Sequence, residues 1–271
     1  MQRGVTLLAA LAALSFATPS AQSQEKVKVG LLVTLSGPAA VLGGQVRDGF
    51  NLAVKALGGK LGGADAEVIV ARVREAGADV LFLQELTGDV ITRLDQAGLD
   101  NLMPQRITEL RGSSLGSGIY SRFPLDEGQP LAPAYAAQPT AVLKLPGGVA
   151  VELGCVHPRA PLPPSPVAVA RWRQELSVLP RPAELPRLLA GDFNATLDHA
   201  PLRDVLRLGY ADAAREVGNA LKPTWGQVGR PAVITIDHVL VDRRCAVIAS
   251  SVHAVPGTDH RAVYAEVRLP G

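Results

Sequence analysis

Acidic, amide and imidazole side chains recur at the ends of apolar runs along this chain of 271 residues. In LLAGDFNATLDHAPL, residues 188–202, an apolar run leads directly to Asp192 and Asn194. Asp and Asn also form ordinary turns at strand ends, so this motif alone favours a turn. Five further side chains have comparable positions: Glu85, His157, Asp237, Asp259 and His260. If strands bring them to one rim of a sheet, together they can activate water and stabilise developing charge.

Strands are predicted in front of each of these side chains. ARVREAGADVLFLQEL reads as a helix followed by a buried strand at Asp79–Gln84, which ends at Glu85. VAVELGCVHPRAP places His157 after an apolar run, and VITIDHVLVD places Asp237 inside one. VPGTDHRAVYAEV places Asp259 and His260 just before the last strand. The neighbour of Asp237, His238, is predicted to be a structural residue.

The first part of the chain has a different character. Residues 1–23 have a short basic start, an apolar stretch and small polar residues, the pattern of a secretory signal peptide. No Cys follows, so no lipid anchor is indicated, and no other segment approaches the length of a membrane span. We therefore expect a secreted or extracytoplasmic protein. Beyond residue 23, the pattern predicts a strand at Val27–Thr34, a helix at Gly43–Leu57 and a strand at Glu67–Ala71.

Composition sets further bounds. A hydrophobic fraction of 47% and a charged fraction of 19% are typical of a globular protein. A net charge of +2 does not indicate a nucleic-acid binder, and the arginines at 171, 173, 181 and 187 are expected to form a solvated surface. Cys155 and Cys245 are too few and too far apart for a zinc site; two semi-buried thiols are favoured over one disulfide.

Two resemblances divide the chain. KVGLLVTLSGPAAVLGGQVRDGFNLAVKALGG, with the signal peptide, resembles the start of periplasmic substrate-binding proteins for branched-chain amino acids. The motifs LQEL, GSGIYSRFPL, VHPRAP, AGDFNAT, IDHVLV and GTDHRAV, in this order, resemble the endonuclease/exonuclease/phosphatase superfamily over residues 72–269. We therefore expect a signal peptide at 1–23, a binding-protein-like segment at 24–71, and an endonuclease/exonuclease/phosphatase domain at 72–271.

The second resemblance implies a fold, a reaction and roles for the residues. The implied fold is an α/β four-layer sandwich, with two mixed β-sheets packed face to face and helices outside. The implied activity is hydrolysis of a phosphodiester or phosphomonoester with Mg²⁺, or with Mn²⁺ or Ca²⁺ in its place. The matching positions make Glu85 and Asp259 metal ligands. The catalytic residues would be His157, Asp192, Asn194, Asp237 and His260. Asp192 would activate water, Asn194 hold the phosphate, and Asp237 orient His260.

One feature of the family is missing. Its members begin with a strand whose Asn lies beside the catalytic carboxylate, whereas Val27–Gly37 contains no Asn. The first strand is thus expected to be replaced by a foreign segment, which can occupy the same place in the sheet, and activity can be impaired. The alternatives are an amino-acid-binding transporter component and a non-catalytic remnant. The substrate is expected to be a nucleic acid, a phospholipid or a small phosphate ester, with no stable protein partner and a monomeric state.

Overall fold

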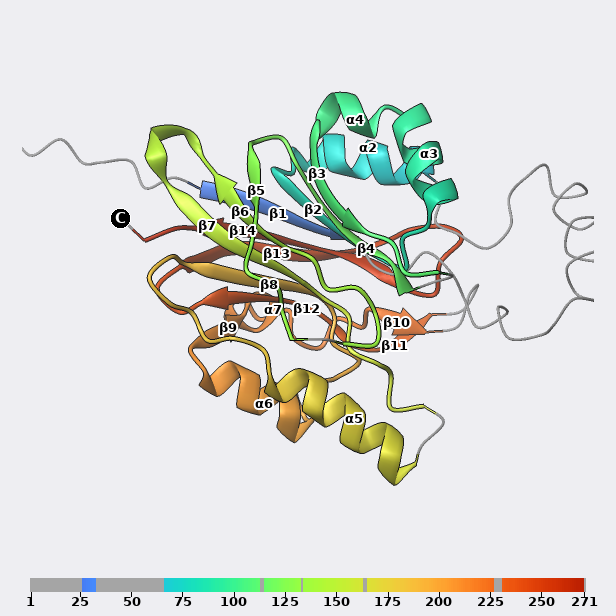
Figure 1. Ribbon diagram of the computed structural model, residues 1–271, viewed down its shortest axis with the longest axis vertical. Coiled ribbons are helices and arrows are strands. Elements are labelled where there is room, and N and C mark those ends of the chain that lie inside the picture. Colours follow the sequence, from blue (N-terminus) through green and yellow to red (C-terminus); the bar gives the residue numbers. More distant parts are fainter. Residues whose placement is uncertain are drawn as a thin grey trace, which may run out of the picture.

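The computed structural model describes residues 66–112, 115–132, 134–162, 165–226 and 231–270, and the backbone of 26–32. The predicted signal peptide and the predicted helix at Gly43–Leu57 lie outside the described residues. Strands and helices are mixed along the described chain, so the predicted α/β class is confirmed (Figure 1). None of the described helices combines the length and the apolar character needed to span a bilayer.

The strands form three hydrogen-bonded sheets, two of six strands and one of two. The first sheet, in the order β13-β14-β1-β2-β4-β3, contains β1 (Lys26–Leu32), β2 (Val80–Gln84), β3 (Gln105–Glu109), β4 (Ser117–Ser121), β13 (Ala246–Ala254) and β14 (Arg261–Arg268). The second, in the order β5-β6-β7-β8-β12-β9, contains β5 (Leu125–Glu127), β6 (Thr140–Lys144), β7 (Ala150–Val156), β8 (Arg187–Asp192), β9 (Tyr210–Asp212) and β12 (Asp237–Asp242). β10 (Trp225–Gly226) and β11 (Ala232–Ile234) pair separately. The sheets are therefore split into more pieces than the two that a clean sandwich would have.

Apolar side chains alternate between two faces of each large sheet. In β2, Val80 and Phe82 join one buried cluster with residues of β6, β7, β8 and β12, while Leu81 and Leu83 join a second cluster with residues of the helices Ala66–Ala76, Gly88–Gln96 and Leu99–Leu102. In β8, Leu189 turns away from the first cluster toward residues of the helices Pro166–Ser177 and Ala200–Arg207. This alternation is the period of two that a strand buried on both faces requires.

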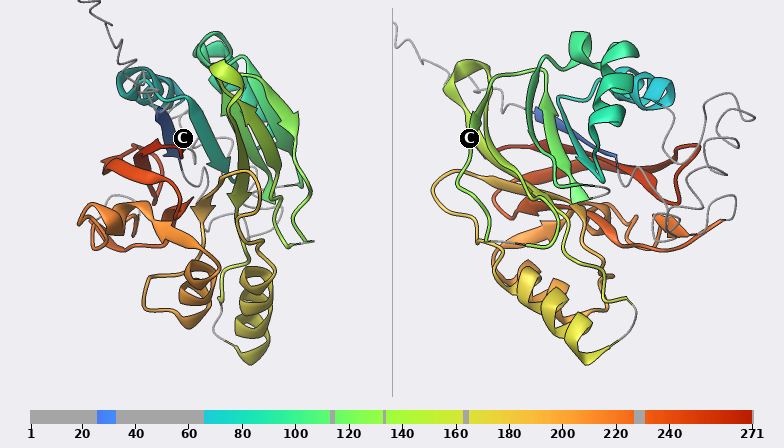
Figure 2. Two further views of the ribbon diagram at one scale, coloured as in Figure 1. Left: turned by 90° about the vertical axis from the view of Figure 1, so that its left-hand side faces the viewer. Right: turned by 45° about the vertical axis from the view of Figure 1, so that its right-hand side comes forward.

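The helices packed on the two large sheets lie toward opposite ends of the molecule in Figure 1 and Figure 2. The helices packed on the first sheet are α2 (Ala66–Ala76), α3 (Gly88–Gln96) and α4 (Leu99–Leu102). Those on the second are α5 (Pro166–Ser177) and α6 (Ala200–Arg207); α7 (Ala213–Glu216) follows β9, and a short 3-10 turn spans Pro146–Gly148. Thr87 and Ser165 cap α3 and α5 by accepting the main-chain N–H groups of Val90 and Ala168.

The predicted strand at Glu67–Ala71 is wrong, because helix α2 runs through it. Val68, Ile69 and Val70 form a short β-branched run, which favours a strand when it is considered locally. The buried positions Ile69, Val70 and Val73 instead follow the helical spacing, and the helix continues without a break across residues 70–72. Burial against the sheet thus outweighs the local propensity.

The first strand of the sheet is formed by residues near the N-terminus. β1 pairs antiparallel with β14 and parallel with β2, so the predicted strand at Val27–Thr34 is confirmed over Lys26–Leu32. It occupies a central position, between the strand that ends at Gln84 and the strand that follows His260. Its sequence KVKVGLL contains no Asn.

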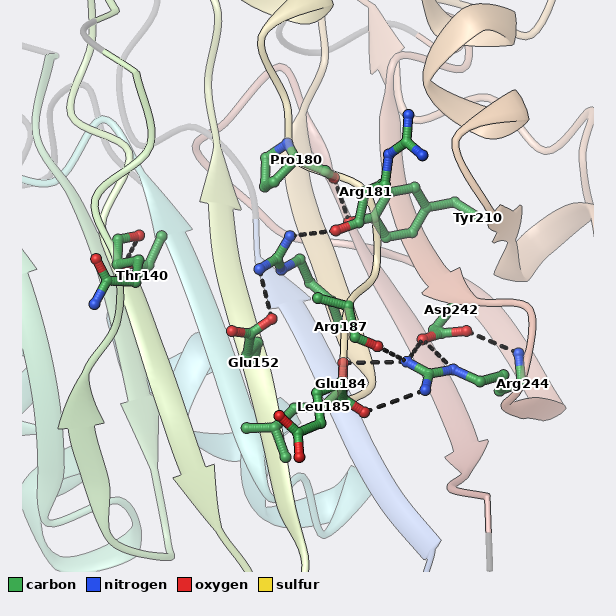
Figure 3. A network of polar contacts seen from close by, with 12 residues as sticks. Thr140, Glu152, Pro180, Arg181, Glu184, Leu185, Arg187, Tyr210, Asp242 and Arg244 are labelled. Atoms are coloured by element: carbon green, nitrogen blue, oxygen red, sulfur yellow. Dashed lines mark hydrogen bonds and ion pairs between the residues drawn. The ribbon is translucent and has the colours of Figure 1, made fainter.

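A network of arginines holds the proline-rich connection between α5 and β8 (Figure 3). Arg244 donates to the carbonyls of Ala183, Glu184 and Leu185, and pairs with Asp242. Arg187 pairs with Glu152 of β7 at 2.5 Å and its side chain is only 14% exposed. The Arg187 side chain is therefore mostly enclosed and forms an ion pair within the fold, whereas the sequence predicted a solvated side chain.

Cys155 and Cys245 are both free thiols, and Cys155 is fully buried.

Gly191 allows the two strands beside the predicted site to approach closely. A Cβ atom built on Gly191 would lie 1.9 Å from the carbonyl oxygen of Val156, and its φ of +155° is rarely adopted by other residues. Because backbone atoms of β7 would have to move, we expect Gly191→Ala to lower the free energy of unfolding by about 3 kcal/mol. Urea unfolding measures this change, with Gly147→Ala as the comparison, since a Cβ there meets no atom within 4 Å. Equal losses in the two variants would contradict the assignment to close packing.

Candidate active site

Two carboxylates and an imidazole meet where β8 and β12 lie side by side. Asp192, the last residue of β8, is directly opposite Asp237, the first residue of β12, in the antiparallel register. The Nδ1 atom of His260 lies 3.1 and 3.0 Å from the two carboxylate oxygens of Asp237. All three side chains are buried, and their ligand atoms lie within 4.8 Å of one another, so this group could hold a metal ion.

Burial and mutual repulsion make Asp192 an unusually basic carboxylate. Burial raises its pKa to about 7, and the nearby charges of Asp237 and Glu85 act in the same direction. The positive charge of His260 and the N–H of Asn194 act against this rise, the latter as a 2.7 Å hydrogen bond. Near neutral pH, Asp192 is therefore poised to take up or release a proton.

The two histidines predicted to be catalytic, His157 and His260, have different charge states at neutral pH. Burial alone would lower the pKa of His260, but the carboxylate of Asp237, with help from Asp192 and Asp259, raises it to about 9. Burial and the charge of His260 lower the pKa of His157 to about 4. At neutral pH the site thus contains an imidazolium at His260 and a neutral imidazole at His157.

Asn194 connects the end of β8 to the segment that carries His157. Its backbone is left-handed, with φ +49°, and its side-chain amide donates to the carbonyl oxygen of Pro158 at 3.1 Å. His157 follows β7, and its N–H is accepted by the side chain of Gln138 at 3.1 Å. The His157 Nδ1 atom is buried and has no hydrogen-bond partner among the described residues. These contacts connect the segment after β7, which carries His157, to the segment after β8, which carries Asn194.

Glu85 and Asp259 flank strands of the first sheet and lie near the group of Asp192, Asp237 and His260, but outside its set of ligand atoms within 4.8 Å of one another. Glu85 follows β2 with a left-handed φ of +54°, and its charge contributes to the raised pKa of Asp192. Asp259 precedes β14, and its Oδ2 atom accepts the indole N–H of Trp225 at 3.2 Å. Its Oδ1 atom is buried without a hydrogen-bond partner in the described part of the chain. Glu85 and Asn194 are the two described non-glycine residues with positive φ, a strain that often accompanies functional sites.

Three neighbours of the site were given no role from the sequence. Thr224 accepts the N–H groups of Ile236 and Asp237 through its hydroxyl oxygen, which fixes the start of β12. Trp225 bridges to the backbone of His260 and holds Asp259. Gln138 holds His157. The motif PTW, residues 223–225, was the available signal for the first two.

The donor set suits a hard divalent cation. Glu85, Asp192, Asp237 and Asp259 provide carboxylate oxygens, which Mg²⁺ and Ca²⁺ prefer. The Oδ1 atom of Asp259 is buried and has no hydrogen-bond partner among the described residues, so it is available to a bound cation. His260 donates its Nδ1 proton to Asp237 as an imidazolium, so that nitrogen is not available to bind a cation.

Comparison with known proteins agrees with this geometry. The model of the Endonuclease/Exonuclease/phosphatase family matches residues 50–260. The chain belongs to this family. The match begins before residue 72, and no comparison supports the expected resemblance of the N-terminal segment to amino-acid-binding proteins. No curated protein matches the chain significantly.

Several solved structures share the fold with this chain at low sequence identity. An endonuclease/exonuclease/phosphatase from Beutenbergia cavernae is 21% identical with a TM-score of 0.62, over 91% of this chain and 72% of that one. D. rerio TDP2, complexed with a single-strand DNA product, is 15% identical with a TM-score of 0.59, over 90% and 99%. A mannosyl-6-phosphatase from Bacteroides thetaiotaomicron is 17% identical with a TM-score of 0.58, over 89% and 99%. The chain therefore has the phosphoesterase-type hydrolase fold of its family, and the structures that share this fold are named for different substrates.

The proton on Asp192 has a testable effect on stability without bound metal. A carboxyl group whose pKa is higher in the folded protein than in the unfolded chain destabilises the fold as pH rises between the two values. For Asp192 this interval runs from about 4 to about 7. We therefore expect Asp192→Asn, which mimics the protonated form, to gain thermal stability over the wild type as pH rises through this interval in EDTA. Mg²⁺ is expected to reduce the difference at pH 7; a difference independent of pH would contradict it.

Proposed function

We propose that this protein is a metal-dependent phosphoesterase that hydrolyses a phosphodiester. The supporting observation is a buried group of three side chains. Asp192, whose pKa is raised to about 7, lies within 4.8 Å of the His260 imidazolium, which Asp237 holds by hydrogen bonds. A carboxylate of this basicity can accept a proton from water at neutral pH, and the imidazolium supplies positive charge for phosphoryl oxygens. The fold and the family membership agree with this chemistry.

Each predicted catalytic residue has a role in this proposal. Asp192 accepts the proton of the attacking water, and Asn194 holds the water or a phosphoryl oxygen without adding charge. His260, kept protonated by Asp237, stabilises negative charge on the phosphoryl group. His157, neutral at pH 7, can donate a hydrogen bond to the same group. The family Asn expected on the first strand is not in β1; Asp192 receives an N–H from Asn194.

We assign the metal to Glu85 and Asp259, with Mg²⁺ the expected ion and Mn²⁺ or Ca²⁺ as alternatives. The unpartnered oxygen of Asp259 and the nearby charge of Glu85 support this assignment. When bound, such a cation supplies positive charge to the phosphoryl oxygens and lowers the cost of clustering carboxylates. Proton transfer from water and the hydrogen bonds to the phosphoryl group are provided by Asp192, Asn194, His157 and His260.

Four further expectations belong to the proposal. The two six-stranded sheets would be the inner layers of the four-layer sandwich, because they share one apolar cluster. The domain would begin upstream of residue 72, because the family match begins at 50 and β1 lies in the sheet. The signal-like residues 1–23 support secretion. We expect a monomer without a stable protein partner.

An arginine stacked on a tyrosine favours substrates with a second anionic group. Arg159 lies two residues beyond His157 in the sequence. Its guanidinium group is 3.6 Å from the centre of the Tyr135 ring. Arg111 donates to the carbonyls of Ala134 and Ala136 on either side of Tyr135, and Glu175 accepts the N–H of Arg159. Among the described residues, no carboxylate pairs with the Arg159 guanidinium. The N–H groups of the Arg159 guanidinium are thus available to bind a phosphate next to the scissile ester.

This preference predicts a selective effect of Arg159→Met. The variant is expected to raise KM about 10-fold for a 5′-phosphorylated dinucleotide, because one charge-assisted contact is lost. KM for the same dinucleotide without the 5′-phosphate should be unchanged. Arg171→Met, on the exposed side of α5, is the matched control. Equal effects on both substrates would exclude Arg159 as a contact for the second phosphate.

The function itself is tested by hydrolysis of bis-p-nitrophenyl phosphate, with p-nitrophenyl phosphate and plasmid DNA as further substrates. We expect hydrolysis of the diester with Mg²⁺, loss of activity in EDTA, and recovery when Mg²⁺ is returned. Asp192→Ala and His260→Ala should abolish it. Activity equal in wild type and both variants would contradict the assignment, and inactivity on all three substrates would favour a non-catalytic remnant.

A further inference from the structure

His238 has no part in the proposed reaction, yet it is one of the most completely enclosed polar residues near the site. It is the second residue of β12, so its side chain points to the opposite face of the sheet from that of Asp237. Its side chain is 1% exposed. Its ring packs edge-on against Phe193, with 5.7 Å between ring centres. His238 therefore lies behind the site and does not face a substrate.

Both ring nitrogens of His238 meet hydrogen-bond acceptors. Nδ1 lies 2.7 Å from Oδ2 of Asp212, and Nε2 lies 2.8 Å from the carbonyl oxygen of Ala195. The other oxygen of Asp212 accepts the N–H of Arg215 at the start of α7, which fixes that carboxylate. With an acceptor on each side, the ring donates twice as an imidazolium. Burial alone would lower the pKa of His238, but these two partners raise it.

The carbonyl of Ala195 belongs to the turn that carries Asn194. That turn holds Asn194 in a left-handed conformation, which is unfavourable for most L-residues. Trp172 donates its indole N–H to the carbonyl of Phe193 at 3.2 Å, on the other side of Asn194. Carbonyls before and after Asn194 are therefore both held by buried side-chain donors. Such anchors keep the Asn194 N–H on Asp192 and its amide in place.

We propose that His238, fixed by Asp212, is a positioning residue that holds the Asn194 turn in its active conformation through the Ala195 carbonyl. The proposal rests on the proposed function of the Asp192 site. It assigns a purpose to the His of IDHVLV and to a strand, β9, that is remote from the substrate. A misplacement of a catalytic group by about 1 Å can reduce rates by about 100-fold, so even a small shift of this turn should be measurable.

Two substitutions separate the two hydrogen bonds of His238. Gln places a donor near the Nε2 position and can keep the bond to Ala195, whereas Asn places one near Nδ1 and can keep only the bond to Asp212. We expect H238N to lose about 10- to 100-fold in kcat/KM, and H238Q to stay within a few-fold of wild type. Each substitution is also combined with D212N, so that the buried Asp212 carboxylate is not left without the positive charge of His238. Thermal unfolding is measured for all four variants.

Amide hydrogen exchange of residues 192–196 provides a second readout that needs no activity. Faster exchange of the Asn194 amide in H238N but not in H238Q is the expected result. Activity that follows thermal stability alone, with equal exchange in both variants, would overturn the proposal and leave His238 as a core ion pair. If the wild type hydrolyses no phosphate ester, the exchange result still tests the anchor, while the proposed function fails separately.

Discussion

Asp192→Asn is expected to reduce kcat for phosphodiester hydrolysis by about 10²- to 10⁴-fold, the usual contribution of a general base. The amide has nearly the same shape, but it cannot accept the proton of the attacking water. Asn194 donates its N–H to Oδ1 of Asp192, and an amide oxygen can accept the same bond. The loss should therefore reflect chemistry more than structure, and steady-state kinetics with Mg²⁺ present measures it.

The same variant should be at least as stable as the wild type near pH 7. Burial beside Asp237 and Glu85 opposes ionisation of Asp192, so removal of its charge relieves a cost of folding. Lost activity with retained or increased stability is uncommon for a buried substitution. Asp198→Asn, on the exposed part of the same loop, serves as the control and should change neither quantity. An inactive variant that is also unfolded would leave the base assignment without support, and a fully active one would exclude it.

Much of the site follows from strand order and strand ends. Asp192 and Asp237 both lie at strand termini, and the antiparallel pairing of β8 with β12 brings them together. His260 follows a loop and precedes β14, so it arrives from the other sheet. The sequence pattern predicted that these three groups would share a site, and the structure brings them together. Ordered motifs are informative here because each side chain lies where its strand ends.

Other features depend on contacts that no local pattern contains. His238 finds Asp212 and Ala195 only after β9, β12 and the Asn194 turn have packed together. Gln138 reaches His157 from a loop 19 residues away in sequence. Residues 67–71 show the reverse problem, since their β-branched side chains favour a strand locally while the apolar spacing extends into a helix. In each case tertiary packing decides, and a single sequence records it weakly.

His260→Gln is the second substitution with a large expected effect, again about 10²- to 10⁴-fold in kcat. The imidazolium lies within 4.8 Å of the buried Asp192 and Asp237 carboxylates, and its positive charge opposes the rise in the pKa of Asp192. Its loss removes charge stabilisation from the phosphoryl group and leaves Asp237 without its donor. His253→Gln, on β13, is the matched control and should leave kcat unchanged.

Asp237→Asn tests how that charge is maintained. The Asp237 carboxylate raises the pKa of both His260 and Asp192, so its removal should lower both values. The wild type is expected to show a bell-shaped dependence of kcat/KM on pH, rising near 7 as Asp192 ionises and falling near 9 as His260 loses its proton. In Asp237→Asn the whole bell should shift to lower pH, because both limbs depend on the same carboxylate.

A double variant distinguishes this shared role from two independent ones. If Asp237 acts through His260, then Asp237→Asn should cost little more once His260→Gln is present, and the two losses should not add. If Asp237 acts separately, for example as a metal ligand, the losses should add and the fall near pH 9 should stay in place in the single variant. The direction of the shift in the alkaline limb therefore decides between an oriented imidazolium and a carboxylate that serves only the cation.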